Sequence, residues 1–233
     1  MNDGSGVDRS GGRAWAAVLP PVAIGLLMAG QLVTPPGLDQ PIRSLGTARA
    51  ELATAGAHVV RLYLSTCLIL LGLGALAAAF AAIALLCDRR GSALAAVSSV
   101  VAAGACVCGI AVNSLVSLNL AGATRSGAAP PGTDTLLVSV NTGPTATAIL
   151  ATYIGGLCAA SVLMAVALWR ARAARWLAVL FPICLVGGSV SPPGPVGVLM
   201  SLPIATVMVL LGRKLWKPAE PARPTAHHTV LNA

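Results

Sequence analysis

Residues 62–87 run LYLSTCLILLGLGALAAAFAAIALLC, without one charged side chain. A helix needs about 20 predominantly apolar residues to cross the hydrocarbon core of a bilayer. This stretch is long enough, and it offers water almost nothing to solvate. We therefore expect it to form a membrane-spanning helix.

Four further intervals of the chain also lack charge, namely residues 14–38, 91–124, 135–169 and 176–212. The last would be about 55 Å long as one helix, which is too long for a single crossing. The sequence SPPGP at residues 191–195 interrupts it, and proline both removes a backbone donor and clashes with the preceding turn. We expect two short spans there. The predicted spans are residues 14–33, 62–86, 92–120, 146–169, 176–190 and 196–212.

The first interval has some features of a signal peptide, because Arg9 and Arg13 precede its apolar run. However, no convincing small-x-small cleavage site follows, and the sequence TPP at residues 34–36 ends the run. We expect a retained first span that bends near Pro20 and Pro21.

The composition of the whole chain favours a membrane protein, with 56% hydrophobic and 9% charged residues. A soluble domain carries about 25% charged residues. The 15 Lys and Arg residues exceed the 7 Asp and Glu residues, but they occur in short clusters between apolar stretches. A nucleic-acid-binding protein would gather them on one polar face. We therefore expect a lipid bilayer as partner and no nucleic acid.

The distribution of the cations predicts an orientation, because positive charge is retained on the cytoplasmic side. With the N-terminus inside, four cations lie in outer segments: Arg43, Arg49, Arg61 and Arg125. The other eleven are Arg9, Arg13, Arg89, Arg90, Arg170, Arg172, Arg175, Arg213, Lys214, Lys217 and Arg223. We expect an all-α, polytopic transmembrane helix bundle of about six spans, N-in and C-in. The excess of arginine over lysine and the abundant alanine favour a high-GC bacterium, and hence the bacterial cytoplasmic membrane.

Segments outside the spans divide into tails and loops. Residues 1–13 and 217–233 are polar or proline-rich, and we expect disordered cytoplasmic tails on either side of a membrane domain at 14–216. The alanine-rich stretch from Thr47 to Arg61 predicts a helix with Thr47 as its N-cap, either lying on the outer surface or continuing into span two. The glycines and prolines of residues 123–145 predict a flexible linker.

Polar residues gather in the outer half of the predicted bundle, and they are the candidate ligand-binding residues: Gln31, Glu51, His58, Arg61, Asn113 and Ser117. Asn113 and Ser117 share a helix face. Arg61 ends span two, with Glu51 on roughly the same face. One hypothesis is an outward-open pocket for a small polar or anionic ligand. The alternative is ordinary hydrogen bonding between helices, with an interfacial Glu–Arg pair.

The sequence gives little indication of proton pumping, voltage sensing, metal binding or catalysis. No charged residue lies at the middle of a predicted span, which argues against proton pumps and voltage sensors. The cysteines lie in apolar stretches, and Cys106 and Cys108 point about 200° apart on a helix, so we expect packing residues and no metal or cofactor. No catalytic motif is present. Small residues in spans two to four suit helix packing or homo-oligomerisation: Gly72, Gly74, Gly104, Gly109, Gly155 and Gly156.

Three functions stay open. The first is a non-enzymatic membrane protein that binds a partner or small ligand at its outer face. The second is a small-molecule transporter or permease component, which requires Gln31, Asn113 and Arg61 to converge on a water-filled cavity. The third is a membrane-embedded enzyme, which requires Glu51, His58 and Arg61 to face one cleft.

The basic segment ALWRARAARWLA at residues 167–178 joins two predicted spans, with a tryptophan on each side. Gly187-Gly188 and Leu202-Pro203 follow. Together with the helical first outer loop, this layout is similar to a family of uncharacterised six-span bacterial integral membrane proteins, a domain of unknown function. The resemblance implies a six-span bundle, and it carries no activity to this chain.

Overall fold

The computed structural model describes residues 9–36, 38, 42–87, 91–124, 131–172, 175–189 and 194–216. Within them the chain forms eight α-helices and no strand, which confirms the all-α class. The helices are α1 (Arg9–Val33), α2 (Leu45–Ala57), α3 (Val59–Ala84), α4 (Ser92–Thr124), α5 (Thr133–Thr142), α6 (Pro144–Arg170), α7 (Arg175–Ser189) and α8 (Pro195–Trp216).

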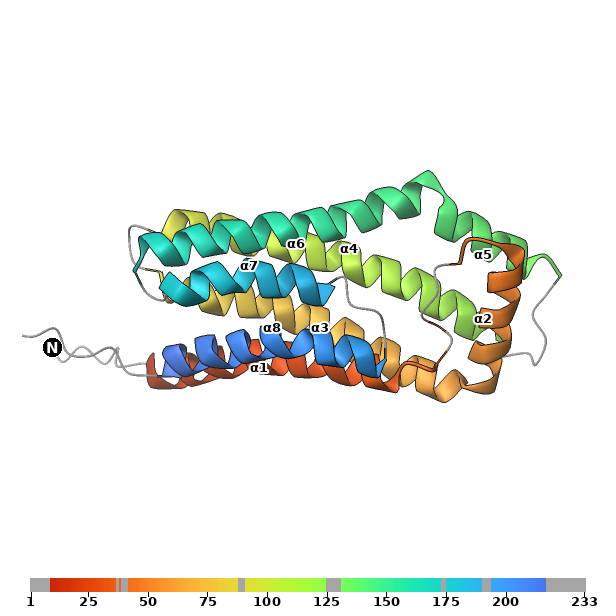
Figure 1. Ribbon diagram of the computed structural model, residues 1–233, viewed down its shortest axis with the longest axis horizontal. Coiled ribbons are helices and arrows are strands. Elements are labelled where there is room, and N and C mark those ends of the chain that lie inside the picture. Colours follow the sequence, from red (N-terminus) through yellow and green to blue (C-terminus); the bar gives the residue numbers. More distant parts are fainter. Residues whose placement is uncertain are drawn as a thin grey trace, which may run out of the picture.

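Six of these helices form a closed ring. Going around it, α1 packs against α3, then come α4, α6, α7 and α8, and α8 returns to α1. The long helices lie side by side along one axis, whereas α2 crosses that axis at one end of the bundle (Figure 1). Each ring helix therefore has two neighbours.

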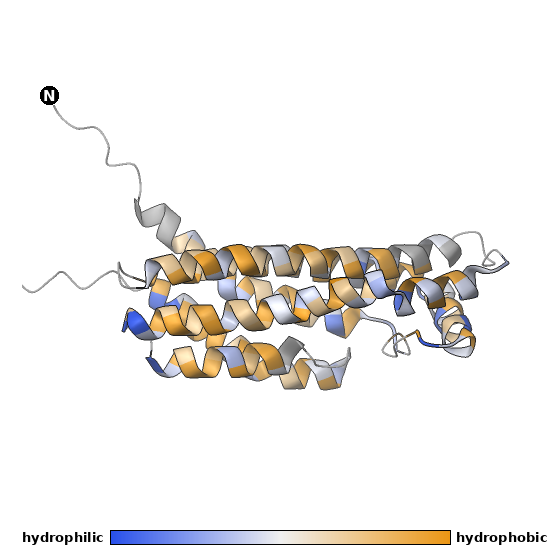
Figure 2. Ribbon diagram, turned by 90° about the horizontal axis from the view of Figure 1, so that it is seen from above, coloured by the Kyte–Doolittle hydropathy of each residue, from blue (hydrophilic) through white to orange (hydrophobic). Residues whose placement is uncertain are grey.

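Of the helices in the described residues, five are long and apolar enough to cross a membrane: Ala14–Val33 of α1, α3, Ser92–Ser117 of α4, α6 and α8. The chain is thus a membrane protein by the length and composition of its helices. The sixth ring helix, α7, has 15 residues, or about 22 Å at 1.5 Å per residue, and it ends part-way along the bundle (Figure 1). Hydrophobic residues recur along the long helices, and strongly hydrophilic ones lie towards the two ends (Figure 2).

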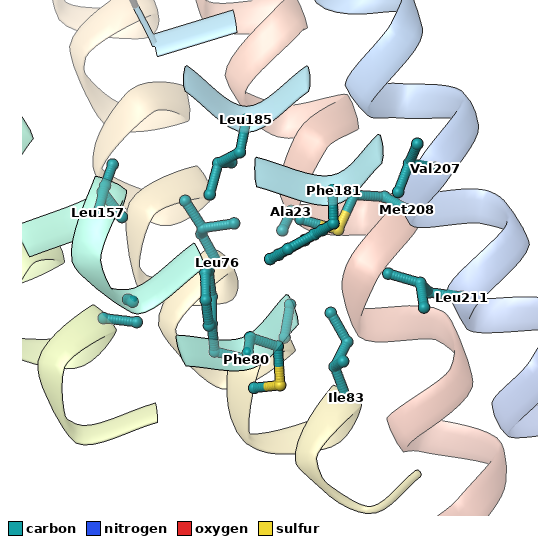
Figure 3. Close-up of a cluster of buried hydrophobic side chains, with 14 of the residues drawn as sticks. Ala23, Leu76, Phe80, Ile83, Leu157, Phe181, Leu185, Val207, Met208 and Leu211 are labelled. Carbon is teal, nitrogen blue, oxygen red and sulfur yellow. The ribbon is translucent and has the colours of Figure 1, made fainter. Parts of the chain in front are cut away.

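The main core fills the interior of the ring, and α7 contributes side chains to it. Phe80 of α3 and Phe181 of α7 are both fully buried, and their rings meet edge to face with centroids 5.5 Å apart. Figure 3 shows Ala23 of α1 and Met208 of α8 in the same cluster. Large apolar side chains also cover the outside of the bundle, for example Val100, which is 73% exposed, as expected of a surface that faces lipid.

Small and hydroxyl side chains hold neighbouring helices close. A Cβ atom added at Gly212 of α8 would lie 2.5 Å from the Ala17 carbonyl oxygen of α1. The buried hydroxyl of Ser98 donates a 2.7 Å hydrogen bond to the Ala160 carbonyl oxygen, which links α4 to α6. The Ser65 hydroxyl donates similarly from α3 to α1. Close backbone approach and interhelical hydrogen bonds are common means of association in lipid.

We call α2, α5 and the adjoining end of α4 the cap. They share a second small apolar cluster, separate from the main core, and its buried members include Ile42, Leu52, Leu120 and Leu137. At the end of α2, His58 adopts φ −133° and ψ 35°, which interrupts the helix before α3 begins. The helix predicted in the first outer loop is therefore present, lies across the end of the bundle and leads directly into α3.

Two details of the predicted loops were wrong. Ser44, not Thr47, is the N-cap of α2: its hydroxyl oxygen accepts from the Thr47 N–H, and the Thr47 hydroxyl oxygen accepts from the Ser44 N–H. The predicted linker at 123–145 contains α5, because its glycines and prolines flank a ten-residue helix and do not interrupt it.

Part of the predicted N-terminal tail is helical in the structure. Helix α1 begins at Arg9, so residues 9–13 of the segment expected to be disordered are helical, and α1 continues through Pro20 and Pro21. The remainder of both predicted tails, residues 1–8 and 217–233, lies outside the described residues.

Candidate functional site

A pocket of about 850 Å³ opens where α5 meets α6. Gly143 ends α5 and caps α6 with an extended backbone (φ −66°, ψ 155°), and Pro144 occupies the first turn of α6. Proline is well suited to this position because the first helical N–H has no intrahelical partner. The chain turns sharply here (Figure 1), and the pocket lies between this elbow, α4 and the segment that precedes α2.

The pocket has an apolar wall on both sides. Helix α4 contributes Val112, Leu115 and Val116, and the first turns of α6 contribute Ile149 and Leu150. These side chains lie near the end of the apolar part of α4, which spans Ser92–Ser117. The pocket is thus at the level where the apolar helices give way to the cap.

The polar groups of the pocket gather on the elbow and at the rim. The side chains of Asn141, Thr142 and Thr147 each donate to a carbonyl oxygen of the preceding turn, at 2.8, 2.8 and 3.2 Å respectively. Residues of the first turn of α6 also line the pocket, and the first turn of a helix carries unshared N–H groups and a positive dipole end. The exposed Arg43 adds a full positive charge.

None of the six predicted site residues lines this pocket. Asn113 and Ser117 each follow a pocket residue of α4 by one position, and both are half-buried. The amide nitrogen of Asn113 donates 2.8 Å to the Gly109 carbonyl oxygen of its own helix. This bond lies within α4, whereas the alternative was hydrogen bonding between helices.

Gln31 lies near the end of α1, on the opposite side of the ring from the elbow. Its carbonyl oxygen accepts a 3.2 Å bond from the Gly194 N–H just before α8. Its side-chain Oε1 is buried and accepts no hydrogen bond from the part of the chain that the structure describes. The residue therefore joins α1 to the start of α8, where Gly194 has φ +95°, a conformation that favours glycine.

The other three residues of the predicted site, in α2 and at the start of α3, differ in burial. Glu51 is 4% exposed and points into the cap, whereas His58 and Arg61 are exposed. The break at His58 separates the face of α2 from that of α3. Glu51 is therefore shielded from solvent, whereas the other two side chains are open to it.

An ion pair that the sequence did not suggest holds the cap together. The Arg49 Nε of α2 donates 2.7 Å to the Asp134 Oδ2 of α5. This hydrogen bond, with a second from the Thr135 N–H, lowers the pKa of the Asp134 carboxyl below its usual value. The two residues are far apart in the sequence, and only the folding of the cap brings them together.

Neither a metal site nor a disulfide is found in the described residues. No three His, Cys, Asp or Glu side chains among them gather closely enough to hold a metal ion. All six cysteines are free thiols, and Cys106 is buried in the main core.

Comparisons with protein-family models, curated proteins and solved structures found no match for this chain. The function is therefore argued from the pocket, the charges and the arrangement of the helices.

Proposed function

We propose that this is a six-span protein of the bacterial cytoplasmic membrane, with both termini inside, that binds a small amphipathic ligand at its outer face. The observation that carries the proposal is the pocket of about 850 Å³ at the junction of α5 and α6. Pockets for small molecules typically measure about 300–1,000 Å³ and combine apolar walls with a few polar groups.

The chemistry of the pocket supports an amphipathic ligand with an anionic or strongly polar group. The walls formed by Val112, Leu115 and Leu150 suit an apolar chain. Arg43 and the first turn of α6 suit a negative or hydrogen-bond-accepting group. Since the pocket lies at the end of the apolar helices, such a ligand would keep its apolar part at bilayer depth.

The charge distribution supports the orientation. Arg170 and Arg213 lie at the end of the bundle remote from the cap, and cations are retained in the cytoplasm. The place of α7 in the ring supports a sixth crossing, because α6 and α8 both end in basic residues at the same end of the bundle (Figure 1).

The other two functions receive less support from the geometry. Transport was expected to need Gln31, Asn113 and Arg61 around one cavity, and none of them lines the pocket. Enzymatic chemistry was expected to need Glu51 beside His58 and Arg61, and Glu51 faces the interior of the cap while the other two are exposed. Binding without chemistry is the simplest use of an apolar pocket with a polar rim.

The binding proposal is tested by filling the pocket. Dansyl-undecanoate, a single-chain anion, is titrated into the purified protein in a neutral detergent, and thermal stability is followed. We expect the wild type to be stabilised and Val112→Trp to be insensitive. Val100→Trp, on the lipid-facing side of the same helix, is the matched control and should respond like the wild type. Equal stabilisation of all three proteins would refute the proposal.

A further inference from the structure

The end of the bundle remote from the cap concentrates positive charge from three consecutive helices. We call it the basic end, and its cations are Arg170, Arg172, Arg175, Arg213 and Lys214. Each of these residues is exposed. Because α7 packs between α6 and α8, its first turn lies beside the last turns of both neighbours. The α6–α7 turn and the end of α8 are at the same end in Figure 1.

The two carboxylates that the structure describes lie at the other end of the bundle. Glu51 and Asp134 both belong to the cap, at the far end of helices about 40 Å long. That separation is several Debye lengths at physiological ionic strength, so their field is screened before it reaches the basic end. The positive charge of the four arginines at the basic end is therefore not offset by Glu51 or Asp134.

The backbone at the centre of this turn is unusual. Arg172 has φ +54°, and among the described residues it is the one non-glycine with a positive φ. Its N–H donates 3.1 Å to the Trp169 carbonyl oxygen and so closes the end of α6. Glycine normally occupies such a position, because a Cβ atom makes the left-handed conformation costly. The chain has 25 glycines but places an arginine here, and strained positions of this kind often accompany function.

Tryptophans surround the cations at this end. Trp169, Trp176 and Trp216 are 52%, 54% and 64% exposed, and the Arg175 guanidinium lies 6.0 Å from the centre of the Trp169 ring. Exposed tryptophans prefer the headgroup level of a bilayer. They therefore hold the guanidinium groups at the depth of lipid phosphates, where arginine binds phosphate oxygens through two parallel N–H donors.

We propose that the basic end is a binding site for the headgroup of an anionic phospholipid, with Arg172 as a principal contact. Charge complementarity selects the partner, because clusters of basic residues next to membrane helices recognise acidic headgroups. The three-helix origin of the cluster means that one lipid would tie the ends of α6, α7 and α8 together. This inference does not depend on what occupies the pocket, since the two sites lie at opposite ends of the bundle.

The test measures how strongly added lipid stabilises the protein in a neutral detergent, with cardiolipin and phosphatidylcholine as the two probes. We expect cardiolipin to raise the melting temperature of the wild type and phosphatidylcholine to leave it unchanged. Native mass spectrometry on the same samples should show cardiolipin retained. Equal effects of the two lipids would overturn the proposal, and so would an equal rise produced by inorganic phosphate, which would indicate an anion site without lipid.

The decisive variant is Arg172→Gly, which removes the guanidinium while favouring the observed backbone. Without lipid, its stability should equal or exceed that of the wild type. Its apparent affinity for cardiolipin should fall about fivefold, the effect of one surface cation on an acidic headgroup. The apparent affinity of Arg213→Gln for cardiolipin should fall similarly. That of Arg61→Gln, at the cap end, should match the wild type. Full cardiolipin affinity in both Arg172→Gly and Arg213→Gln would refute the proposal.

Discussion

At the scale of single residues, small side chains differ sharply in what they do. Gly72, Gly109 and Gly156 each have a side-chain atom of a neighbouring helix within 2.8 Å of where a Cβ would lie. Gly74, Gly104 and Gly155 have nothing within 4 Å. The sequence predicts that these glycines serve helix packing, but it does not distinguish the two groups. The distinction depends on how each helix is rotated about its axis, and the uniformly apolar helices leave that rotation weakly marked.

One of the two closest approaches of this kind, at Gly212, gives the first prediction. In Gly212→Ala the new Cβ would meet the Ala17 carbonyl oxygen, which belongs to backbone and cannot rotate away. We expect destabilisation by about 1–3 kcal/mol, as for other overpacked sites. Gly155→Ala, which meets open space, should be neutral or stabilising by up to about 1 kcal/mol. Unfolding of both variants in mixed detergent, followed by circular dichroism, measures the difference, and equal losses would contradict it.

The hydroxyl pair on α4 gives a second prediction at this scale. Ser98 donates to α6, whereas its neighbour Ser99 donates 2.9 Å to the Ala95 carbonyl oxygen of its own helix. Ser98→Ala should lower the free energy of unfolding by about 0.6 kcal/mol, and by no more than about 1.7 kcal/mol. Ser99→Ala should have a smaller effect in the same unfolding assay. A larger loss in the Ser99 variant would show that the interhelical bond contributes little.

At the scale of elements, the long helices and α2 followed from the sequence, whereas α5 and the packing of the cap did not. Any apolar stretch of sufficient length must satisfy its backbone internally in lipid, so residues 62–87 had to be helical. The cap depends on contacts between distant segments, such as Ile42 before α2, Leu120 of α4 and Leu137 of α5. The pocket has the same origin, because its walls come from three separate parts of the chain. No local sequence pattern predicts such a site, and the six residues predicted to bind a ligand do not line the pocket.

The ion pair of the cap predicts a pH dependence. Because the pKa of Asp134 is lower in the folded protein than in the unfolded chain, the pair stabilises the cap above about pH 4. That contribution is lost as the pH falls through the folded pKa. Amide exchange in α2 should therefore be faster in Asp134→Asn than in the wild type at pH 6, and the difference should shrink as the pH falls through the folded pKa of Asp134. Comparison at equal pH cancels the intrinsic exchange rate, and Arg61→Gln serves as the control. A difference that stays constant down to the lowest pH at which the protein remains folded would exclude the carboxylate charge as its cause.

At the scale of the whole molecule, the ring bears on how many of its helices cross the membrane. Five helices qualify by length, and α7 falls short, yet α7 supplies Phe181 to the middle of the core. A helix that stopped outside the bilayer would not be expected to bury a phenylalanine between α3 and α8 in the core. The sequence supports the same count through its cations, since five crossings would place Arg213 and Lys214 outside.

The topology is tested with alkaline phosphatase, which is active only in the periplasm. Fusions within residues 190–193 and after residue 142 should be active, and fusions at residue 173 and after Trp216 should be inactive. Activity after Trp216 together with inactivity at 190–193 would leave five crossings. Fusions to a fluorescent protein that folds only in the cytoplasm should give the complementary pattern and thereby exclude failures of expression.

The shortness of α7 has a mechanical consequence if this helix crosses the membrane. Its length of about 22 Å falls below the roughly 30 Å of an ordinary hydrocarbon layer. On that flank the surrounding leaflet must dip, or water must enter, whereas the flank formed by α3 and α4 meets a layer of full thickness. Such a lopsided footprint costs elastic energy that grows with acyl-chain length. The protein would consequently prefer thin regions of bilayer. It would also tend to cluster with other proteins that thin the bilayer locally.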